Sequence, residues 1–196
     1  MILALAVAVG LIAGTLRATW HKTTLKIPLL NLSWLVFVAV IPQILAFQVS
    51  RTAQWVSPSW AKAILVTSQI LLLGFVIANN KQPGIWLLGL GLALNLFVIS
   101  LNGGLMPITP EIASRVHPAI SAEEWVPGSR LGFGKDIILR TADIRLELLS
   151  DRFLFPSWFP YRVAFSLGDV LIAIGTIQFL WVAAAPGAIN PKEFSG

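Results

Sequence analysis

Long apolar runs alternate with short polar stretches along most of the chain. Most runs approach the roughly 20 residues that an α-helix needs to cross a hydrocarbon layer about 30 Å thick. Lipid offers no partners for backbone groups, so such runs form helices that satisfy their own hydrogen bonds. The pattern predicts an all-α, polytopic membrane protein with a single membrane domain over residues 1–196. The five predicted transmembrane helices cover about residues 1–18, 27–49, 60–78, 83–101 and 163–185.

The composition changes little in this picture. Hydrophobic residues make up 56% of the 196 residues and charged residues only 12%, with a mean hydropathy of +0.79. Soluble domains carry about 25% charged residues. Eight Trp against one Tyr also fit a membrane protein, because Trp favours the membrane interface. The net charge of +5 is scattered between apolar runs, so no nucleic-acid partner is expected.

The basic residues of the short loops predict an orientation, because Lys and Arg favour the cytoplasmic side. Five of them fall on one side of the predicted topology, and only Arg51 and Lys62 fall on the other. We therefore expect a multi-pass protein of the bacterial inner membrane, with its N-terminus outside and its C-terminus cytoplasmic. The five residues on the cytoplasmic side are Arg17, Lys22, Lys26, Lys81 and Lys192.

The outer segment, residues 102–162, opens with Asn102, Gly103 and Gly104. Asn and Gly tolerate the left-handed conformation that ends a helix. The three residues therefore indicate either a helix stop or a cradle of backbone N–H groups suited to an anion or a peptide.

Residues 136–153 have a helical period and predict an amphipathic helix lying in the membrane interface. Asp151 falls on its polar arc, near the outer surface, whereas Arg145 and Arg152 point into its apolar face. An arginine there either snorkels, with lipid phosphates as its partners, or pairs with a buried acid. Small residues four apart, Gly10 with Gly14 and Ala164 with Gly168, further suggest helix contacts.

Asp169 is the one acidic residue inside a predicted span, about two turns from its outer end. A charge in that place marks a functional site by default. The alternative is structural: Asp169 accepts hydrogen bonds from Ser166 or from the backbone of Gly103 and Gly104, or it pairs with Arg145 or Arg152. The other polar residues of the spans are expected to bridge helices: Gln43, Gln69, Asn95 and Gln178.

The sequence contains few residues of the kinds that bind metals or cofactors. It contains no Cys and two His, His21 and His117. Disulfides and thiolate-bound metals are therefore excluded, and we predict no metal site and no cofactor. His21 leaves a pigment ligand open, although its place beside Lys22 favours an interfacial role.

The stretches Asn102–Pro107 and Ser166–Gly175 resemble an uncharacterised bacterial family of small five-helix membrane proteins. That family carries an Asn-Gly-Gly-x-Met-Pro turn and a Ser-x-Gly-Asp-Val-Leu-Ile-Ala-Ile-Gly end. The resemblance covers the last half of the chain in sequence and the first half in hydropathy. It implies a five-helix fold and supplies no activity.

A fainter resemblance is to lipoprotein signal peptidase, an intramembrane aspartyl protease. Asp151-Arg152 and Phe165–Asp169 are similar to its motifs in order and rough separation. Ser166 and Gly168 depart from the family, which has Asn and Ala there. The resemblance implies that Asp151 and Asp169 activate a water together, one as base and one as acid.

We interpret the sequence as a non-enzymatic membrane component or subunit with a lipid- or partner-binding site on its outer face. Its expected partners are membrane lipids and other membrane subunits. The alternatives are an intramembrane aspartyl hydrolase, with Asp151 and Asp169 as its catalytic pair, and a small transporter. The candidate binding residues are Asn102, Gly103, Gly104, Arg145, Arg152 and Asp169.

Overall fold

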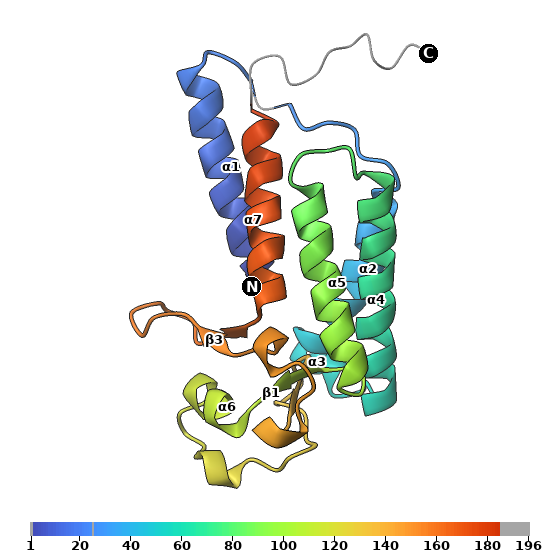
Figure 1. Cartoon of the computed structure of the whole chain (residues 1–196), viewed down its shortest axis with the longest axis vertical. Helices are drawn as coiled ribbons and strands as arrows, with labels where there is room; N and C mark the ends of the chain where they lie inside the picture. Colours follow the sequence, from blue (N-terminus) through green and yellow to red (C-terminus); the bar gives the residue numbers. More distant parts are fainter. Residues whose placement is uncertain (1, 25, 185–196) are drawn as a thin grey trace.

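Five long helices run side by side, and residues 102–166, with their shorter elements, form a cap at one end of them (Figure 1). The computed structural model describes residues 2–24 and 26–184. Within these residues there are seven α-helices, two of them short: α3 (Ser50–Ala53) and α6 (Pro110–Val116). The long helices are α1 (Ile2–Trp20), α2 (Trp34–Phe47), α4 (Pro58–Ala78), α5 (Ile85–Leu101) and α7 (Leu167–Val182).

The long helices form an arc that does not follow their order in the chain. Helix α1 packs on α7, α7 on α5, α5 on α4, and α4 on α2. The first and last helices of the described chain are therefore neighbours (Figure 1). This arrangement matters for the candidate site, because the arc borders a cavity.

Two of the five predicted spans coincide with helices that are long and apolar enough to cross a membrane by length and composition. These are α1, with 19 residues, and α4, with 21. The other three correspond to the shorter apolar helices α2, α5 and α7, which have 14, 17 and 16 residues. The predicted span that starts at residue 27 becomes helical only at Trp34.

A reciprocal hydrogen-bond pair explains this late start of α2. The Asn79 side chain accepts from the backbone N–H of Asn31 and donates to its carbonyl, both at 2.8 Å. The next residue, Leu32, has a φ of +53°. Backbone groups held by another side chain, followed by a left-handed residue, cannot continue a helix.

Helices α5 and α7 approach closely through glycines. A Cβ on Gly91 would lie 2.4 Å from the carbonyl oxygen of Gly168, and one on Gly175 would lie 2.5 Å from the backbone nitrogen of Leu88. Small residues allow such backbone contact between helices. Neither position has room for a side chain unless the helices move apart.

Of the two small-residue pairs expected to make helix contacts, one lies within a helix and the other does not. Gly10 and Gly14 are both buried in α1, and a Cβ on Gly10 would lie 2.7 Å from Leu180 Cδ1 of α7. Ala164 and Gly168 do not share a helix, because Ala164 lies in a strand. Gly168 packs against α5 without it.

The predicted interfacial helix over 136–153 is wrong. That segment contains strand β2 (Asp136–Ile138), 3-10 turns at Thr141–Asp143 and Glu147–Leu149, and the start of β3 (Phe153–Leu154). Strand β2 pairs in parallel with β1 (Met106–Ile108), a long-range contact that a helical period cannot reveal. Strand β2 has only three residues, which is too short to show the two-residue period of a strand. The apolar residues of this segment therefore match a helical period by spacing alone.

The cap has a small hydrophobic core of its own, which includes Ile108, Ala113 and Ile138. Strand β3 pairs with β4 (Ala164–Phe165) in an antiparallel hairpin that leads directly into α7. The cap is thus a packed unit, and it fixes where α7 begins.

Candidate functional site

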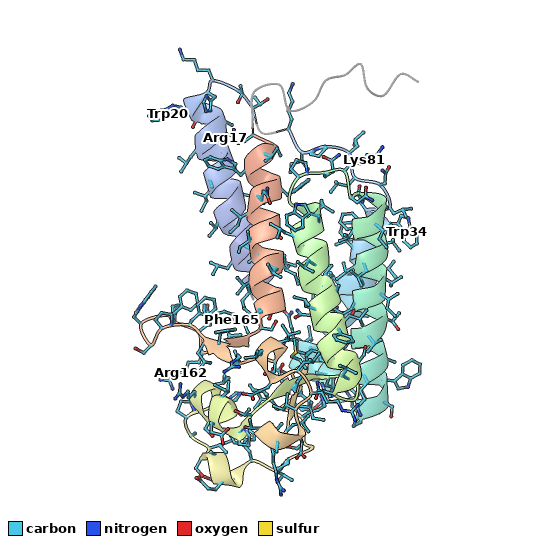
Figure 2. All side chains as sticks on the ribbon, viewed as in Figure 1. Arg17, Trp20, Trp34, Lys81, Arg162 and Phe165 are labelled. Atoms are coloured by element: carbon cyan, nitrogen blue, oxygen red, sulfur yellow. The ribbon has the colours of Figure 1, made fainter. Side chains whose placement is uncertain are left out.

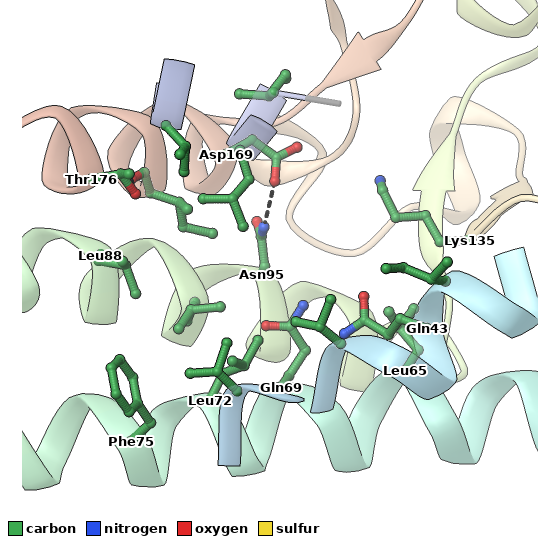
Figure 3. A pocket seen from close by; sticks show the side chains of 18 of the residues that line it. Gln43, Leu65, Gln69, Leu72, Phe75, Leu88, Asn95, Lys135, Asp169 and Thr176 are labelled. Atoms are coloured by element: carbon green, nitrogen blue, oxygen red, sulfur yellow. Dashed lines mark hydrogen bonds between the residues drawn. The ribbon is translucent and has the colours of Figure 1, made fainter. Parts of the chain in front are cut away.

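A cavity of about 540 Å³ lies inside the arc of helices. All five long helices contribute to its lining, which is mostly apolar along α2, α4, α5 and α7. Toward the cap the lining becomes polar, as Figure 3 shows for several of these side chains. The polar residues on this side include Gln43, Gln69, Asn95, Lys135 and Asp169.

Asp169 is anchored at the start of α7. Its carboxylate accepts from the Ser166 backbone N–H at 3.2 Å, and the Ser166 hydroxyl accepts from the Asp169 N–H at 3.1 Å, which makes a capping box. Asn95 of α5 donates to Asp169 Oδ1 at 2.9 Å and accepts from the Ser166 hydroxyl at 2.9 Å (Figure 3). The network caps α7 and ties it to α5.

The Asp169 carboxylate therefore has a structural task, as one of the two readings from the sequence expects, with Ser166 as a partner. It lies in the first turn of α7 and not two turns down, because the chain before it forms β4 and the N-cap. Asp169 also lines the cavity and is only half-buried. Asp169 can therefore cap α7 and still be accessible from the cavity.

Lys135 carries the positive charge of the cavity lining. Its ammonium lies 3.0 Å from Asp136 Oδ1 and is in direct contact with Asp151 Oδ2. The Lys135 side chain keeps 36% of its surface accessible, whereas the Asp151 side chain is fully buried. Thus one lysine at the cavity faces two carboxylates from the cap.

The charges of this cluster shift the pKa values of its members. Burial would lower the pKa of Lys135, but Asp136, Asp151 and Asp169 together raise it well above its usual value. Burial raises the pKa of Asp151 well above its ordinary range, and the neighbouring acids Asp136 and Asp169 add to the effect against the opposing charge of Lys135. Lys135 is therefore charged, and Asp151 holds its proton more readily than a free carboxyl does.

Gln69 and Gln43 bring amides into the cavity from α4 and α2. The Gln43 amide donates to the Ser68 hydroxyl and so bridges the two helices. Gln69 is 8% exposed, and within the described part of the chain its Oε1 has no hydrogen-bond partner. Figure 3 shows the Gln69 amide reaching from α4 toward Asn95.

The structure gives Asn102, Gly103 and Gly104 the features of a helix end. The Asn102 amide donates to the carbonyl of Arg145 and accepts from its N–H, both at 2.9 Å. The Gly104 N–H donates to the Ile99 carbonyl at 2.8 Å, and both glycines have positive φ. The helix-stop reading accounts for these contacts, and the Asn102 side chain also pins the cap to α5.

Among the described residues, neither Arg145 nor Arg152 pairs with Asp151 or Asp169, so the alternative in which they pair with a buried acid finds no support. Arg145 is exposed, and the Arg152 guanidinium lies 3.9 Å from Glu147 Oε1. Among the described residues, no hydrogen bond joins Asp151 to Asp169 directly. Asp151, predicted to lie on a polar surface, is 1% exposed. That placement was wrong because it rested on the helix that does not form.

Sequence reasoning missed Lys135, which joins the cap to the cavity, because it lies in a loop without a recognisable motif. Gln69 and Asn95 were noticed only as polar residues within spans. Their common feature, a polar group within an apolar run, could have grouped them with Asp169. Among the described residues, no cluster of His, Asp or Glu could hold a metal ion.

Comparison with known proteins finds a family and a bacterial relative that are similar to this chain. An "Uncharacterized protein" of Thermotoga maritima is 29% identical over 126 residues, which cover 61% of this chain and 64% of that protein, or just under two thirds of its length. No solved structure matches the chain. The model of the family of unknown function DUF5317 matches residues 27–181, which cover α2, α4, α5, the entire cap and α7 up to Trp181. The chain belongs to this family.

Proposed function

We propose that this protein is a multi-span, non-enzymatic membrane component that binds an amphiphile in the cavity between its helices. The observation that carries the proposal is the cavity of about 540 Å³, apolar along the helices and polar toward the cap. Ligand sites measure about 300–1,000 Å³ and combine an apolar lining with a few placed polar groups. An apolar chain along the helices and a polar end near Lys135 and Asp169 match this division.

Large apolar side chains on the outside of the helices support a membrane setting. Leu16, Phe37, Ile77, Phe97 and Ile174, one from each long helix, are all exposed. A soluble monomer rarely exposes apolar patches over so much of its surface. We therefore propose that all five long helices lie in the membrane, the three shorter ones extended by uncharged flanking residues.

Exposed tryptophans support the same placement. They gather at both ends of the helices, as expected for the two membrane interfaces. Arg17, Trp20, Trp34 and Lys81 lie toward one end, opposite the cap (Figure 2). The exposed tryptophans are Trp20, Trp34, Trp86 and Trp181 near this end and Trp55, Trp60 and Trp158 near the other.

We propose that the cap faces outward and that the loop after α1 faces the cytoplasm of an inner membrane. Because the sequence contains no Cys, single cysteines can report the topology without a background. Ala119→Cys in the cap should react with a membrane-impermeant maleimide added to intact spheroplasts, and Thr24→Cys should react only after lysis. Both residues are exposed. The reverse pattern would contradict the orientation, and labelling of both in intact spheroplasts would contradict the membrane separation of the two ends.

Native mass spectrometry of the gently extracted protein tests the amphiphile site. We expect a co-purifying lipid on the wild type and its loss in the double variant Leu72→Trp/Leu88→Phe. Both residues line the cavity, which the larger side chains would narrow. Ile77→Trp, an equally large change on the exposed face of α4, is the matched control and should keep the lipid. Equal lipid on all three proteins would refute the cavity as the site.

The hydrolase alternative has less support than lipid binding. A catalytic aspartate pair must share a proton across a short hydrogen bond or around one water. Here Asp151 contacts Lys135, and Asp169 is held by Asn95 and Ser166. The carboxylates are thus engaged by different partners.

A further inference from the structure

The polar part of the cavity offers unused hydrogen-bond acceptors. Within the described residues, Gln69 Oε1 is buried and has no partner. The Asp169 carboxylate accepts single hydrogen bonds at each oxygen, from Asn95 and Ser166, although a carboxylate has about four acceptor sites. A buried acceptor without a partner destabilises the protein, so a ligand that donates a hydrogen bond to Gln69 removes that cost.

The charge around the polar end is negative. The charged side chains that line the cavity are Lys135 and Asp169. Lys135 is already neutralised by Asp136 and Asp151, which contact its ammonium. Even with a proton on Asp151, two carboxylates face one ammonium. A carboxylate or phosphate group placed here would meet this excess of like charge.

We propose that the bound amphiphile has a polar end that donates hydrogen bonds and carries no negative charge, such as a hydroxyl or an ammonium group on a long apolar chain. Gln69 Oε1 accepts from the hydroxyl, or from one N–H of the ammonium, whose other N–H groups donate to the Asp169 carboxylate. The apolar lining of the helices surrounds the chain. This inference rests on the proposed function and specifies the ligand class of the same cavity. It moves lipid recognition away from Arg145 and Arg152, which would select phosphate.

Four probes with a chain of the same number of carbon atoms separate the contributions: hexadecanol, hexadecylamine, methyl hexadecanoate and hexadecanoate. Each is added at neutral pH to delipidated protein in detergent micelles, and binding is followed by native mass spectrometry. We expect the alcohol and the amine to bind about 10-fold or more tightly than the ester, which accepts but does not donate. The anionic hexadecanoate should bind weakest of all.

The variant Gln69→Leu tests the acceptor directly. It has a similar size and removes the buried oxygen, so affinity for hexadecanol should fall about 10-fold while affinity for the ester stays the same. The melting temperature of the delipidated variant should be unchanged or higher, because an unpartnered buried acceptor has been lost. Gln178→Leu, an exposed glutamine of α7, is the matched control and should bind all four probes like the wild type.

The outcomes separate this inference from the proposed function. If hexadecanoate binds as tightly as hexadecanol, or if Gln69→Leu leaves hexadecanol binding unchanged, the ligand class is wrong although the cavity binds amphiphiles. If no probe binds better to the wild type than to Leu72→Trp/Leu88→Phe, the cavity is not a binding site and the proposed function fails as well.

Discussion

Replacing Gly175 by alanine should abolish the native packing of α7 against α5. A Cβ at this position would lie 2.5 Å from the nitrogen of Leu88, 2.6 Å from the carbonyl oxygen of Gly84 and 3.1 Å from Leu88 Cα. All three atoms belong to the backbone, so no side-chain rotation can relieve the contact, and the helices must separate. We expect a loss of about 3 kcal/mol or more in the free energy of unfolding, at or above the upper end of ordinary overpacking.

Gly74→Ala is the control for this change. Gly74 also lies within a long helix, α4, but its Cβ would lie 3.8 Å from Leu35 Cδ1, an ordinary van der Waals contact. There the gain in helix propensity, about 1 kcal/mol in soluble hosts, sets the upper limit of stabilisation. Unfolding in mixed micelles, followed by tryptophan fluorescence, compares the two. Equal stabilities of the two variants would show that α5 and α7 do not depend on glycine contact.

Replacing Lys135 by methionine should also strongly lower the free energy of unfolding. Lys135 is the cationic partner of the fully buried Asp151 and of Asp136. Where Asp151 is ionised, removal of this partner leaves an uncompensated buried charge, which costs about 3–5 kcal/mol. Adding Asp151→Asn should restore part of the loss, because the amide carries no charge. Unfolding of the single and double variants measures the recovery, and Lys81→Met, at an exposed lysine, provides the control.

The effect of Lys135→Met should also depend on pH. The pKa of Asp151 is raised in the folded protein, mainly by burial. Between the ordinary pKa of an aspartate and the raised pKa of Asp151, the folded state binds more protons than the unfolded state. The free energy of unfolding therefore falls as the pH rises through this range. Without Lys135 the acids ionise at greater cost, so the difference from the wild type should grow as pH rises and shrink as pH falls. A difference independent of pH would contradict a charge effect.

The helices could be predicted from the sequence better than the cap could. Apolar runs identify helices by length, and they located α1 and α4 closely. The start of α2 could not be foreseen, since it depends on Asn79 holding the backbone of Asn31 from another helix. The cap was misread because the pairing of β1 with β2 joins residues about 30 positions apart. Such contacts leave no local period.

The candidate site was only partly predictable. Asp169 stood out because an acid is rare in an apolar run, and Ser166 was named as its partner. The other half of its network, Asn95, lies 74 residues away and could be recognised only as a polar residue within a span. Lys135 gave no signal, since its importance comes from the carboxylates that the folded cap brings to it.

The neighbouring positions of α1 and α7 have a consequence for biosynthesis. Helix α1 ends at Trp20, but the face that covers its Gly10 belongs to α7, which is complete only at Val182. At about 5–20 residues per second, a ribosome needs roughly 10–30 s to make the chain between them. During that interval α2, α4 and α5 can pack on one another, while the glycine face of α1 and the face of α5 that holds Gly91 both wait for α7. The nascent chain thus exposes a small-residue surface on α1 until α7 has been made, and during this interval a chaperone or a competing helix has access to it.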